Sequence, residues 1–280
     1  MICIMNFNRN NEKRQVPGIN AVKTIFDHAP LLRYISHRGF TPLAPENSIP
    51  GFEYAGMLRQ WAIETDVRIT RDGKLVCCHD ADVSRMFGEA GKVEEMSFEQ
   101  ISGLRFCSGN RLECFTDERR KMPLFSEYLA ICRRYGSVPF IELKTPDVKS
   151  VLREVNRAGF EENEVVISAI PEDWLRETRR CTRDAFVHWI FADEQRLEEF
   201  ARMGNAGVSL NIPDAFSCPK DQIDAAHDLG LGICLRAGDN VTSVKQMIEL
   251  GLDYIPTNCM HLPMGSFERR STNEIQHHLL

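Results

Sequence analysis

The sequence predicts an α/β protein, a TIM (β/α)8 barrel with a small insertion after its second strand. From Val138 onward, short apolar runs alternate with amphipathic stretches, which is the pattern of repeated βα units around a parallel sheet. The length of 280 residues suits one such barrel, because these domains typically run to about 250 residues. We therefore expect residues 31–265 to form the barrel, between an extension at 1–30 and a tail at 266–280.

Eight strands are expected in the barrel, two of them before Val138 and six after it. In chain order they are RYISH (33–37), AIETDV (62–67), VPFIEL (138–143), EVVISA (164–169), FVHWIF (186–191), GVSLN (207–211), GICLR (232–236) and DYIPT (253–257). Helices are expected between them, beginning with residues 48–60. After the third strand, Thr145 and Pro146 are typical of a helix N-cap and first turn, and Gly159 of a helix end.

A ninth apolar run, KLVCCH at residues 74–79, is interpreted as the return strand of a hairpin. Too few residues separate it from Val67 for the dozen or more that a parallel crossover needs. The Asp72-Gly73 pair is a hairpin turn signal, and folding back about it brings His79 alongside Glu64 and Asp66. Residues 80–122 then form an irregular, charged excursion, which is either a lid over the barrel mouth or a plain surface loop.

Composition limits the partners and the location of the protein. A net charge of −6 and a pI near 5.8 argue against a nucleic-acid partner, because no basic field is available to hold a phosphate backbone. No run of about 18 apolar residues occurs, and the N-terminal apolar stretch is too short for a secretory signal. We expect a soluble cytoplasmic protein without stable membrane insertion, with reduced cysteines in its core; a homo-oligomer is left open.

Polar residues gather where the early strands end, which is where barrel active sites lie. They are His37 and Arg38, Glu64 and Asp66, His79 on the hairpin, and Glu142 with Lys144. Glu64 and Asp66 are two residues apart, so both side chains point to one face of a strand and repel each other. A hard divalent cation, completed by Glu142, would compensate this charge. The alternative is a pair of solvent-facing acids on a strand edge.

The two histidines and the two basic residues at these strand ends suit acid-base chemistry on a phosphate. Neutral imidazole accepts a proton from an attacking hydroxyl, and a protonated imidazole donates one to a leaving alkoxide, so His37 and His79 are candidates for the two roles. Arg38 and Lys144 offer positive charge to phosphate oxygens. The alternatives are structural histidines and simple ion pairs with Glu64 or Glu142. Asp72, Asp80 and Asp82 are interpreted as turn residues.

The motifs HRG at 37–39, APENS at 44–48, ETDV at 64–67, TRDG at 70–73, HD at 79–80 and IELK at 141–144 occur in this order. Together they closely resemble the glycerophosphodiester phosphodiesterase family, over residues 33–258. The resemblance implies a TIM barrel with an insertion after the second strand. It also implies hydrolysis of a small-molecule glycerophosphodiester to sn-glycerol 3-phosphate and an alcohol, with Mg²⁺ or Ca²⁺ at the site. Mn²⁺ suits the same oxygen ligands.

The resemblance also implies roles for individual residues. Its matches are His37 and His79 as general acid and base; Glu64, Asp66 and Glu142 as metal ligands; Arg38 as a phosphate contact; Lys144 as the lysine beyond the third carboxylate; and Glu46 and Asn47 as the motif that buttresses the first histidine loop.

Two positions depart from the family pattern and leave the leaving group open. Leu235 stands where members commonly carry tryptophan, and Asn258 where they carry aspartate, toward the outer portion of the substrate. One rival function is therefore a phosphodiesterase that acts on lysophospholipids in the manner of lysophospholipase D, which an exposed apolar rim at the barrel mouth would favour. Another is a non-catalytic barrel that binds a phosphodiester or a metal.

Overall fold

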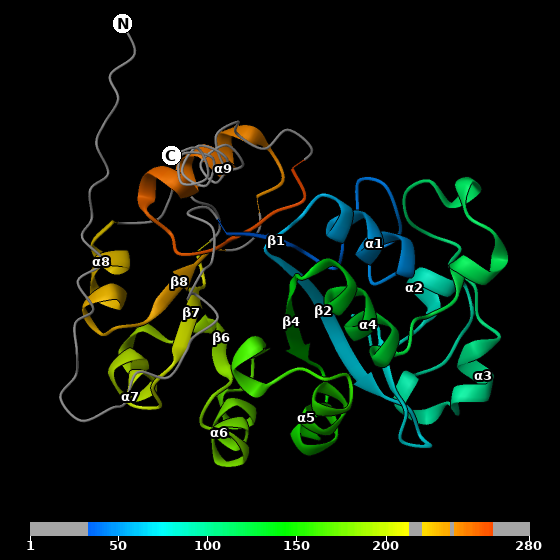
Figure 1. Cartoon of the computed structure of the whole chain (residues 1–280), viewed down its shortest axis with the longest axis horizontal. Coiled ribbons are helices and arrows are strands. Elements are labelled where there is room, and N and C mark those ends of the chain that lie inside the picture. Colours follow the sequence, from blue (N-terminus) through cyan, green and yellow to red (C-terminus); the bar gives the residue numbers. More distant parts are fainter. Residues whose placement is uncertain (1–32, 213–219, 236–237, 260–280) are drawn as a thin grey trace, which may run out of the picture.

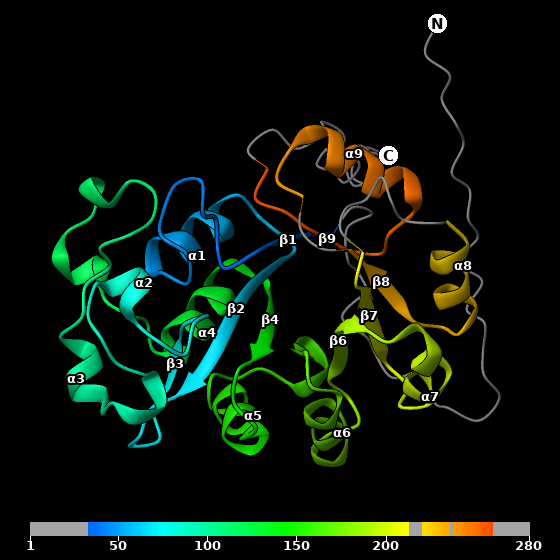
Figure 2. The same cartoon turned by 180° about the vertical axis from the view of Figure 1, so that it is seen from behind.

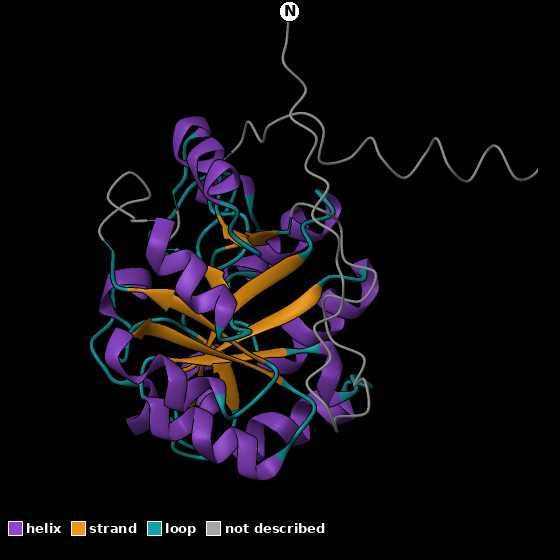
Figure 3. Ribbon diagram, turned by 90° about the vertical axis from the view of Figure 1, so that its left-hand side faces the viewer, coloured by secondary structure: helices purple, strands orange, loops and turns teal. Residues whose placement is uncertain are grey.

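Eight parallel strands surrounded by helices form the centre of the protein, as a computed structural model shows over residues 33–212, 220–235 and 238–259 (Figures 1 and 3). The strands are β1 Tyr34–Ser36, β2 Ala62–Ile69, β4 Val138–Leu143, β5 Val166–Ala169, β6 Phe186–Ala192, β7 Ala206–Leu210, β8 Gly232–Cys234 and β9 Ile255–Pro256. They follow the order β8-β7-β6-β5-β4-β2-β1-β9, with every neighbouring pair parallel. The predicted strand count and barrel are confirmed.

The two ends of this strand order approach each other and nearly close the barrel. The amide of Asp253, just before β9, donates a hydrogen bond of 3.0 Å to the carbonyl of Ile233 in β8. The amide of Ile233 in turn donates to the Asp253 carboxylate at 2.8 Å. The predicted extension at 1–30 and tail at 266–280 lie outside the described residues.

Helices follow the strands and cover the outside of the barrel. The main ones are α1 Ile49–Met57, α4 Phe125–Tyr135, α5 Val148–Arg157, α6 Glu172–Cys181, α7 Leu197–Ala201, α8 Lys220–Asp228 and α9 Val241–Leu250. The predicted cap of α5 was wrong: Asp147, not Thr145, accepts the amide hydrogen of Ser150, at 3.1 Å. A carboxylate at this position also interacts favourably with the helix dipole. Among the described residues, no helix has the length and apolar character needed to cross a membrane.

The predicted hairpin is confirmed. Strand β3, Leu75–Cys77, runs antiparallel to β2 with Val67 opposite Cys77. Gly73 in the turn has a φ of 80°, a left-handed conformation that glycine adopts at little cost. Because β3 pairs with residues 67–69, β2 continues to Ile69, two residues beyond its predicted end.

The excursion at residues 80–122 is more ordered than the sequence predicted. It contains α2 Ser84–Phe87 and α3 Phe98–Ser102, and both lie beside α1 and α4, away from α6 to α8 (Figures 1 and 2). It builds an apolar core of its own against the hairpin, made of Val76, Cys78, Val83, Met86, Phe87, Val93, Ile101, Leu104, Phe106 and Met122. These apolar residues are spaced irregularly over short helices, so no periodicity shows in the sequence. The lid function stays a prediction.

The barrel interior changes from apolar to polar along the strands. Phe140, Val166 and Phe186 lie side by side in register and belong to a buried apolar cluster. Two residues further along each strand, the same face presents Glu142, Ser168 and His188. Strand alternation thus carries the polar layer toward the carboxyl ends, where a barrel builds its site.

Most described cysteines lie in the core, as expected; Cys181 is partly buried against it, and two others are exposed. Cys77, Cys78, Cys132, Cys234 and Cys259 are buried. Cys107 and Cys114 are exposed, because Cys107 lies on a surface loop of the excursion and Cys114 in a short 3-10 helix, Leu112–Cys114, without buried residues. For these two the prediction was wrong, and no disulfide forms among the described cysteines.

Candidate active site

Three carboxylates meet inside the carboxyl half of the barrel. Glu64 and Asp66 lie on one face of β2, and Asp66 stands directly opposite Glu142 in β4. One carboxylate oxygen from each residue lies within 4.8 Å of the others. Glu64 is 5% exposed and Asp66 is fully buried. The alternative of solvent-facing acids on a strand edge is therefore excluded by the burial.

The cost of burying this charge shows in the pKa values. Burial, together with the nearby charges of Asp66 and Glu142, raises the pKa of Glu64 well above its ordinary value. Burial and Asp66 also raise the pKa of Glu142. Burial acts to raise the pKa of Asp66 too, but Lys144, His79 and Arg38 outweigh it, and the net pKa is lowered. The cluster therefore holds one well-compensated carboxylate and two that lack sufficient positive charge.

A divalent cation fits these residues. Glu64 Oε2 accepts the amide hydrogen of Arg38 at 2.7 Å, while Glu64 Oε1 is buried without a hydrogen-bond partner. A buried, unpaired carboxylate oxygen is costly unless something positive binds it. Three oxygen donors converging in a low-dielectric site are the ligand set that Mg²⁺, Ca²⁺ and Mn²⁺ accept.

The first histidine lies on a sharply turned loop after β1. Arg38 has a φ of 57°, and Gly39 follows at 76°, where an added Cβ would come within 2.8 Å of the Gly51 carbonyl carbon. Burial, reinforced by the charge of Arg38, lowers the pKa of His37 to about 4. At neutral pH His37 is therefore an uncharged imidazole that is able to accept a proton.

Asn47 ties this loop to β2. It too adopts a left-handed conformation, with φ at 48°, and its backbone N–H donates a hydrogen bond of 2.9 Å to the Arg38 carbonyl. Its side chain donates to Asp66 Oδ2 at 2.8 Å and accepts from the Thr65 hydroxyl at 2.7 Å. A buried amide satisfied on both sides fixes the rotation of the Asp66 carboxylate.

The second histidine arrives on the hairpin, as predicted. The amide of Cys78 donates to the Asp66 carbonyl at 2.9 Å, which sets the next residue, His79, beside the acidic cluster. The guanidinium of Arg68 holds the His79 carbonyl with bonds of 2.8 and 3.2 Å. His79 Nδ1 lies 2.7 Å from Asp80 Oδ1. A carboxylate only accepts, so in the neutral ring Nδ1 carries the hydrogen and Nε2 keeps its lone pair.

The two predicted phosphate contacts are paired with carboxylates in the structure. Arg38 contacts Glu46 at 3.2 Å and Asp66 at 3.6 Å. Lys144 bonds to Glu142 and lies 3.3 Å from Asp66. Of the ion pairs in the simpler interpretation, Lys144 with Glu142 is present, whereas the Arg38 side chain pairs with Glu46 and Asp66 instead of Glu64 or Glu142. Contact with phosphate stays a prediction.

Residues 37–260 match the sequence profile of the glycerophosphoryl diester phosphodiesterase family, a span that includes both histidines and all three carboxylates. The chain belongs to this family. It is 31% identical to the glycerophosphodiester phosphodiesterase of Caldanaerobacter subterraneus over 234 residues, covering 80% of this chain and 93% of that one. It is also 31% identical to human glycerophosphodiester phosphodiesterase 1 over 163 residues, but spans only 48% of that protein's length.

Solved structures share the fold of this family member. One is a glycerophosphoryl diester phosphodiesterase from Silicibacter pomeroyi, described as putative, with a TM-score of 0.70, 23% identity, and coverage of 84% of this chain and 94% of that one. Another is an Oleispira antarctica phosphodiesterase in complex with the product sn-glycerol 3-phosphate, with a TM-score of 0.74, 17% identity, and coverage of 84% and 96%. At these identities the likeness establishes the barrel fold.

Two residues at the site of this phosphodiesterase family member make contacts that the sequence did not predict. Asn258 is buried, and its side-chain amide donates to the His37 carbonyl at 2.7 Å and to Thr41 Oγ1 at 2.9 Å; its position toward the outer substrate stays a prediction. Asp80 was predicted as a turn residue, but its carboxylate pairs with His79 and Arg85. Asp72 and Asp82 do serve turns, through Thr70 and Ser84. The sequence signal that could have indicated these two roles is a polar residue just after a strand, for Asn258, or next to a candidate histidine, for Asp80.

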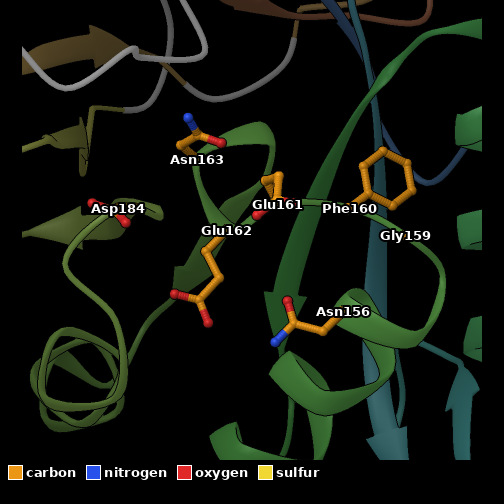
Figure 4. Close-up of a pocket in the computed structure, with 7 residues that line it drawn as sticks. All are labelled: Asn156, Gly159, Phe160, Glu161, Glu162, Asn163 and Asp184. Atoms are coloured by element: carbon orange, nitrogen blue, oxygen red, sulfur yellow. The ribbon is translucent and has the colours of Figure 1, made fainter.

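A surface hollow of about 450 Å³ lies away from this site (Figure 4). Its lining is mainly polar and comprises Asn156, Gly159, Phe160, Glu161, Glu162, Asn163 and Asp184. These residues precede β5 and β6, whereas Glu142 lies near the carboxyl end of β4. In parallel strands those are opposite ends of the barrel, so the hollow is separate from the acidic cluster.

Proposed function

We propose that this protein hydrolyses glycerophosphodiesters to sn-glycerol 3-phosphate and an alcohol, in a reaction that requires a divalent cation. The observation that carries the proposal is the convergence of three carboxylates, two of them buried and Glu142 partly buried, in the part of the barrel where His37 and His79 also lie. The family membership and the product bound by the Oleispira antarctica relative support the choice of substrate. The substrate is thus a small molecule.

Glu64, Asp66 and Glu142 would hold the cation, which is Mg²⁺ or Ca²⁺, with Mn²⁺ compatible. When bound, it supplies Lewis-acid polarisation of the phosphate and neutralises charge that develops there. Asn47 orients Asp66 for this task through its 2.8 Å hydrogen bond, and Glu46 steadies Arg38.

The two histidines would carry the proton transfers. Burial keeps His37 uncharged at neutral pH, and Asp80 fixes the ring of His79 so that Nε2 is free to exchange a proton. Arg38 and Lys144 would turn from their carboxylate partners to the phosphate oxygens as the substrate enters. One histidine, uncharged, accepts a proton from the attacking oxygen, and the other, in its protonated form, donates one to the leaving alkoxide.

An apolar rim favours a second candidate substrate, a lysophospholipid. Ile170 and Phe191 are 48% and 40% exposed, and they follow β5 or end β6 at the catalytic end of the barrel. Phe191 has a φ of 56° at a break in the β6–β7 register, an unfavourable conformation for a bulky residue. Bulges at barrel rims re-aim side chains, and an exposed phenylalanine there suits an acyl chain.

A substrate panel tests both candidates. Purified protein with Mg²⁺ or Ca²⁺ is assayed on glycerophosphocholine, glycerophosphoethanolamine and lysophosphatidylcholine, with and without chelator. Metal-dependent release of glycerol 3-phosphate from a glycerophosphodiester supports the main proposal, whereas turnover of the lysolipid alone, measured as release of choline, favours the second. Binding of substrate without turnover would point instead to a non-catalytic barrel.

Replacing a catalytic and a non-catalytic histidine tests the role of His79. His79→Ala is expected to lose at least about 100-fold in kcat, since general acid-base catalysis contributes 10²–10⁴-fold. The control is His227→Ala. His227 lies on α8, away from the acidic cluster, and pairs with Asp253, so this variant should retain activity. Equal activity of the two variants would contradict the role given to His79.

A further inference from the structure

Arg85 joins two carboxylates from different parts of the chain. It lies in the short helix α2 of the excursion, with its side chain 47% exposed. Its two terminal nitrogens bond to Glu46 at 2.6 and 3.1 Å, and its Nε bonds to Asp80. The five hydrogens of a planar guanidinium suit this double pairing, whereas lysine presents a single point charge.

Both of these carboxylates also contact a proposed working residue. Glu46 Oε1 accepts from Arg38 at 3.2 Å, on the loop that carries His37. Asp80 Oδ1 bonds to His79 Nδ1 at 2.7 Å, on the hairpin. A continuous chain of polar contacts therefore runs from Arg38 through Glu46, Arg85 and Asp80 to His79.

We propose that Arg85 is a positioning residue for the phosphodiesterase reaction, holding Asp80 so that His79 keeps a single ring orientation and tautomer. The inference rests on the proposed function. Without Arg85, the Asp80 carboxylate loses the partner that fixes its rotation, so its bond to the imidazole is no longer held in one geometry. The excursion then contributes to catalysis through this arginine, by ordering two loops that the barrel strands do not connect.

The alternative explanation of these contacts is that Arg85 only secures the excursion to the barrel. A second arginine offers a direct comparison, because Arg119 in the same excursion pairs with Glu53 of α1 at 2.5 Å and is 43% exposed. Isolated exposed ion pairs contribute little to stability. Arg119→Ala thus reproduces the loss of an exposed excursion-to-barrel ion pair without touching Glu46, Asp80 or either histidine.

The kinetic experiment compares Arg85→Ala, Arg85→Lys and Arg119→Ala with wild type on the substrate that the wild type turns over. We expect Arg85→Ala to lose about 10- to 100-fold in kcat, with KM changed less than about threefold, because small misplacements of a reacting group carry this cost. Arg85→Lys should recover part of the loss, and Arg119→Ala should match wild type. In the Asp80→Asn background, Arg85→Ala should cost less than about threefold more, because Arg85 acts through Asp80.

A spectroscopic readout makes the inference independent of the substrate. Long-range ¹H–¹⁵N correlation of ¹⁵N-histidine protein at pH 8 should show His79 with its hydrogen on Nδ1, assigned by the signal missing in His79→Ala. Arg85→Ala should show a tautomer mixture, and Arg119→Ala the wild-type pattern.

Unchanged kcat and an unchanged tautomer in Arg85→Ala, additive losses with Asp80→Asn, or an equal loss in Arg119→Ala would overturn the inference. Should Arg85→Ala fail to fold, the same readouts on Arg85→Lys decide. Absence of wild-type turnover would refute the proposed function instead, leaving the tautomer result to decide on Arg85.

Discussion

Replacing Glu64 with glutamine is expected to stabilise the metal-free protein and to abolish its stabilisation by a divalent cation. Glutamine keeps the size of the side chain and the acceptor for the Arg38 amide, but removes a buried charge beside Asp66 and Glu142. The pKa of Glu64 is raised, chiefly by burial, so above pH 4.5 the unfolded chain releases a proton that the folded protein retains. Stability therefore falls as pH rises from 4.5.

The size of the effect has a ceiling. At about 1.4 kcal/mol per pH unit, the interval from the ordinary value of 4.5 to pH 7 limits the penalty from Glu64 to about 3 kcal/mol. For a domain of this size, that is a gain in Tm of at most roughly 6–12 °C for Glu64→Gln. The gain should shrink toward zero near pH 4.5, where the wild-type carboxyl is protonated in both states.

Thermal unfolding between pH 4.5 and 8, in chelator and then with saturating Mg²⁺ or Ca²⁺, measures both halves of this expectation. Wild type should gain about 3 kcal/mol at a cation concentration 100 times the Kd, and Glu64→Gln much less. Glu172→Gln is the control, because Glu172 is equally buried but paired with Arg176 and Arg196, so its neutralisation should destabilise. A metal-free Glu64→Gln protein less stable than wild type at pH 7 would refute the reasoning.

Three further outcomes are expected. The pKa of buried His188 is lowered to about 3 by burial, so below pH 6.5 the unfolded chain binds a proton that the folded protein does not. The free energy of unfolding therefore falls by about 1.4 kcal/mol per pH unit from pH 6.5 toward 3. Urea unfolding at a series of pH values should show that this free energy depends less steeply on pH in His188→Asn. Asn47→Ala should cost about 2–4 kcal/mol in urea unfolding, because it leaves Asp66 and Thr65 without their buried partner; Asn205→Ala, at a similar φ on a surface loop, should cost less. Phe191→Ser should lower kcat/KM on a lysolipid more than on glycerophosphocholine, and equal effects would argue against an acyl-binding rim.

Local rules of the chain were enough to predict most of the barrel and the acidic cluster. Two-residue alternation places Glu64 and Asp66 on one strand face, and the shared layer of parallel strands brings Glu142 to them. The Asp72-Gly73 turn predicts the hairpin, because its geometry depends on adjacent residues alone. These features depend on spacings of a few residues, which the sequence displays directly.

What the sequence by itself determined is therefore the order of the elements and the set of residues delivered to one end of the barrel. Only the tertiary structure decided how those residues are held. Asn258 reaches the His37 carbonyl across 221 positions, and Arg85 pairs with Glu46 across 39. No local spacing encodes such contacts, because they exist only once the barrel has nearly closed and the excursion has folded its own core against the hairpin. The loop that carries His37 and the hairpin that carries His79 acquire their relative positions at that stage.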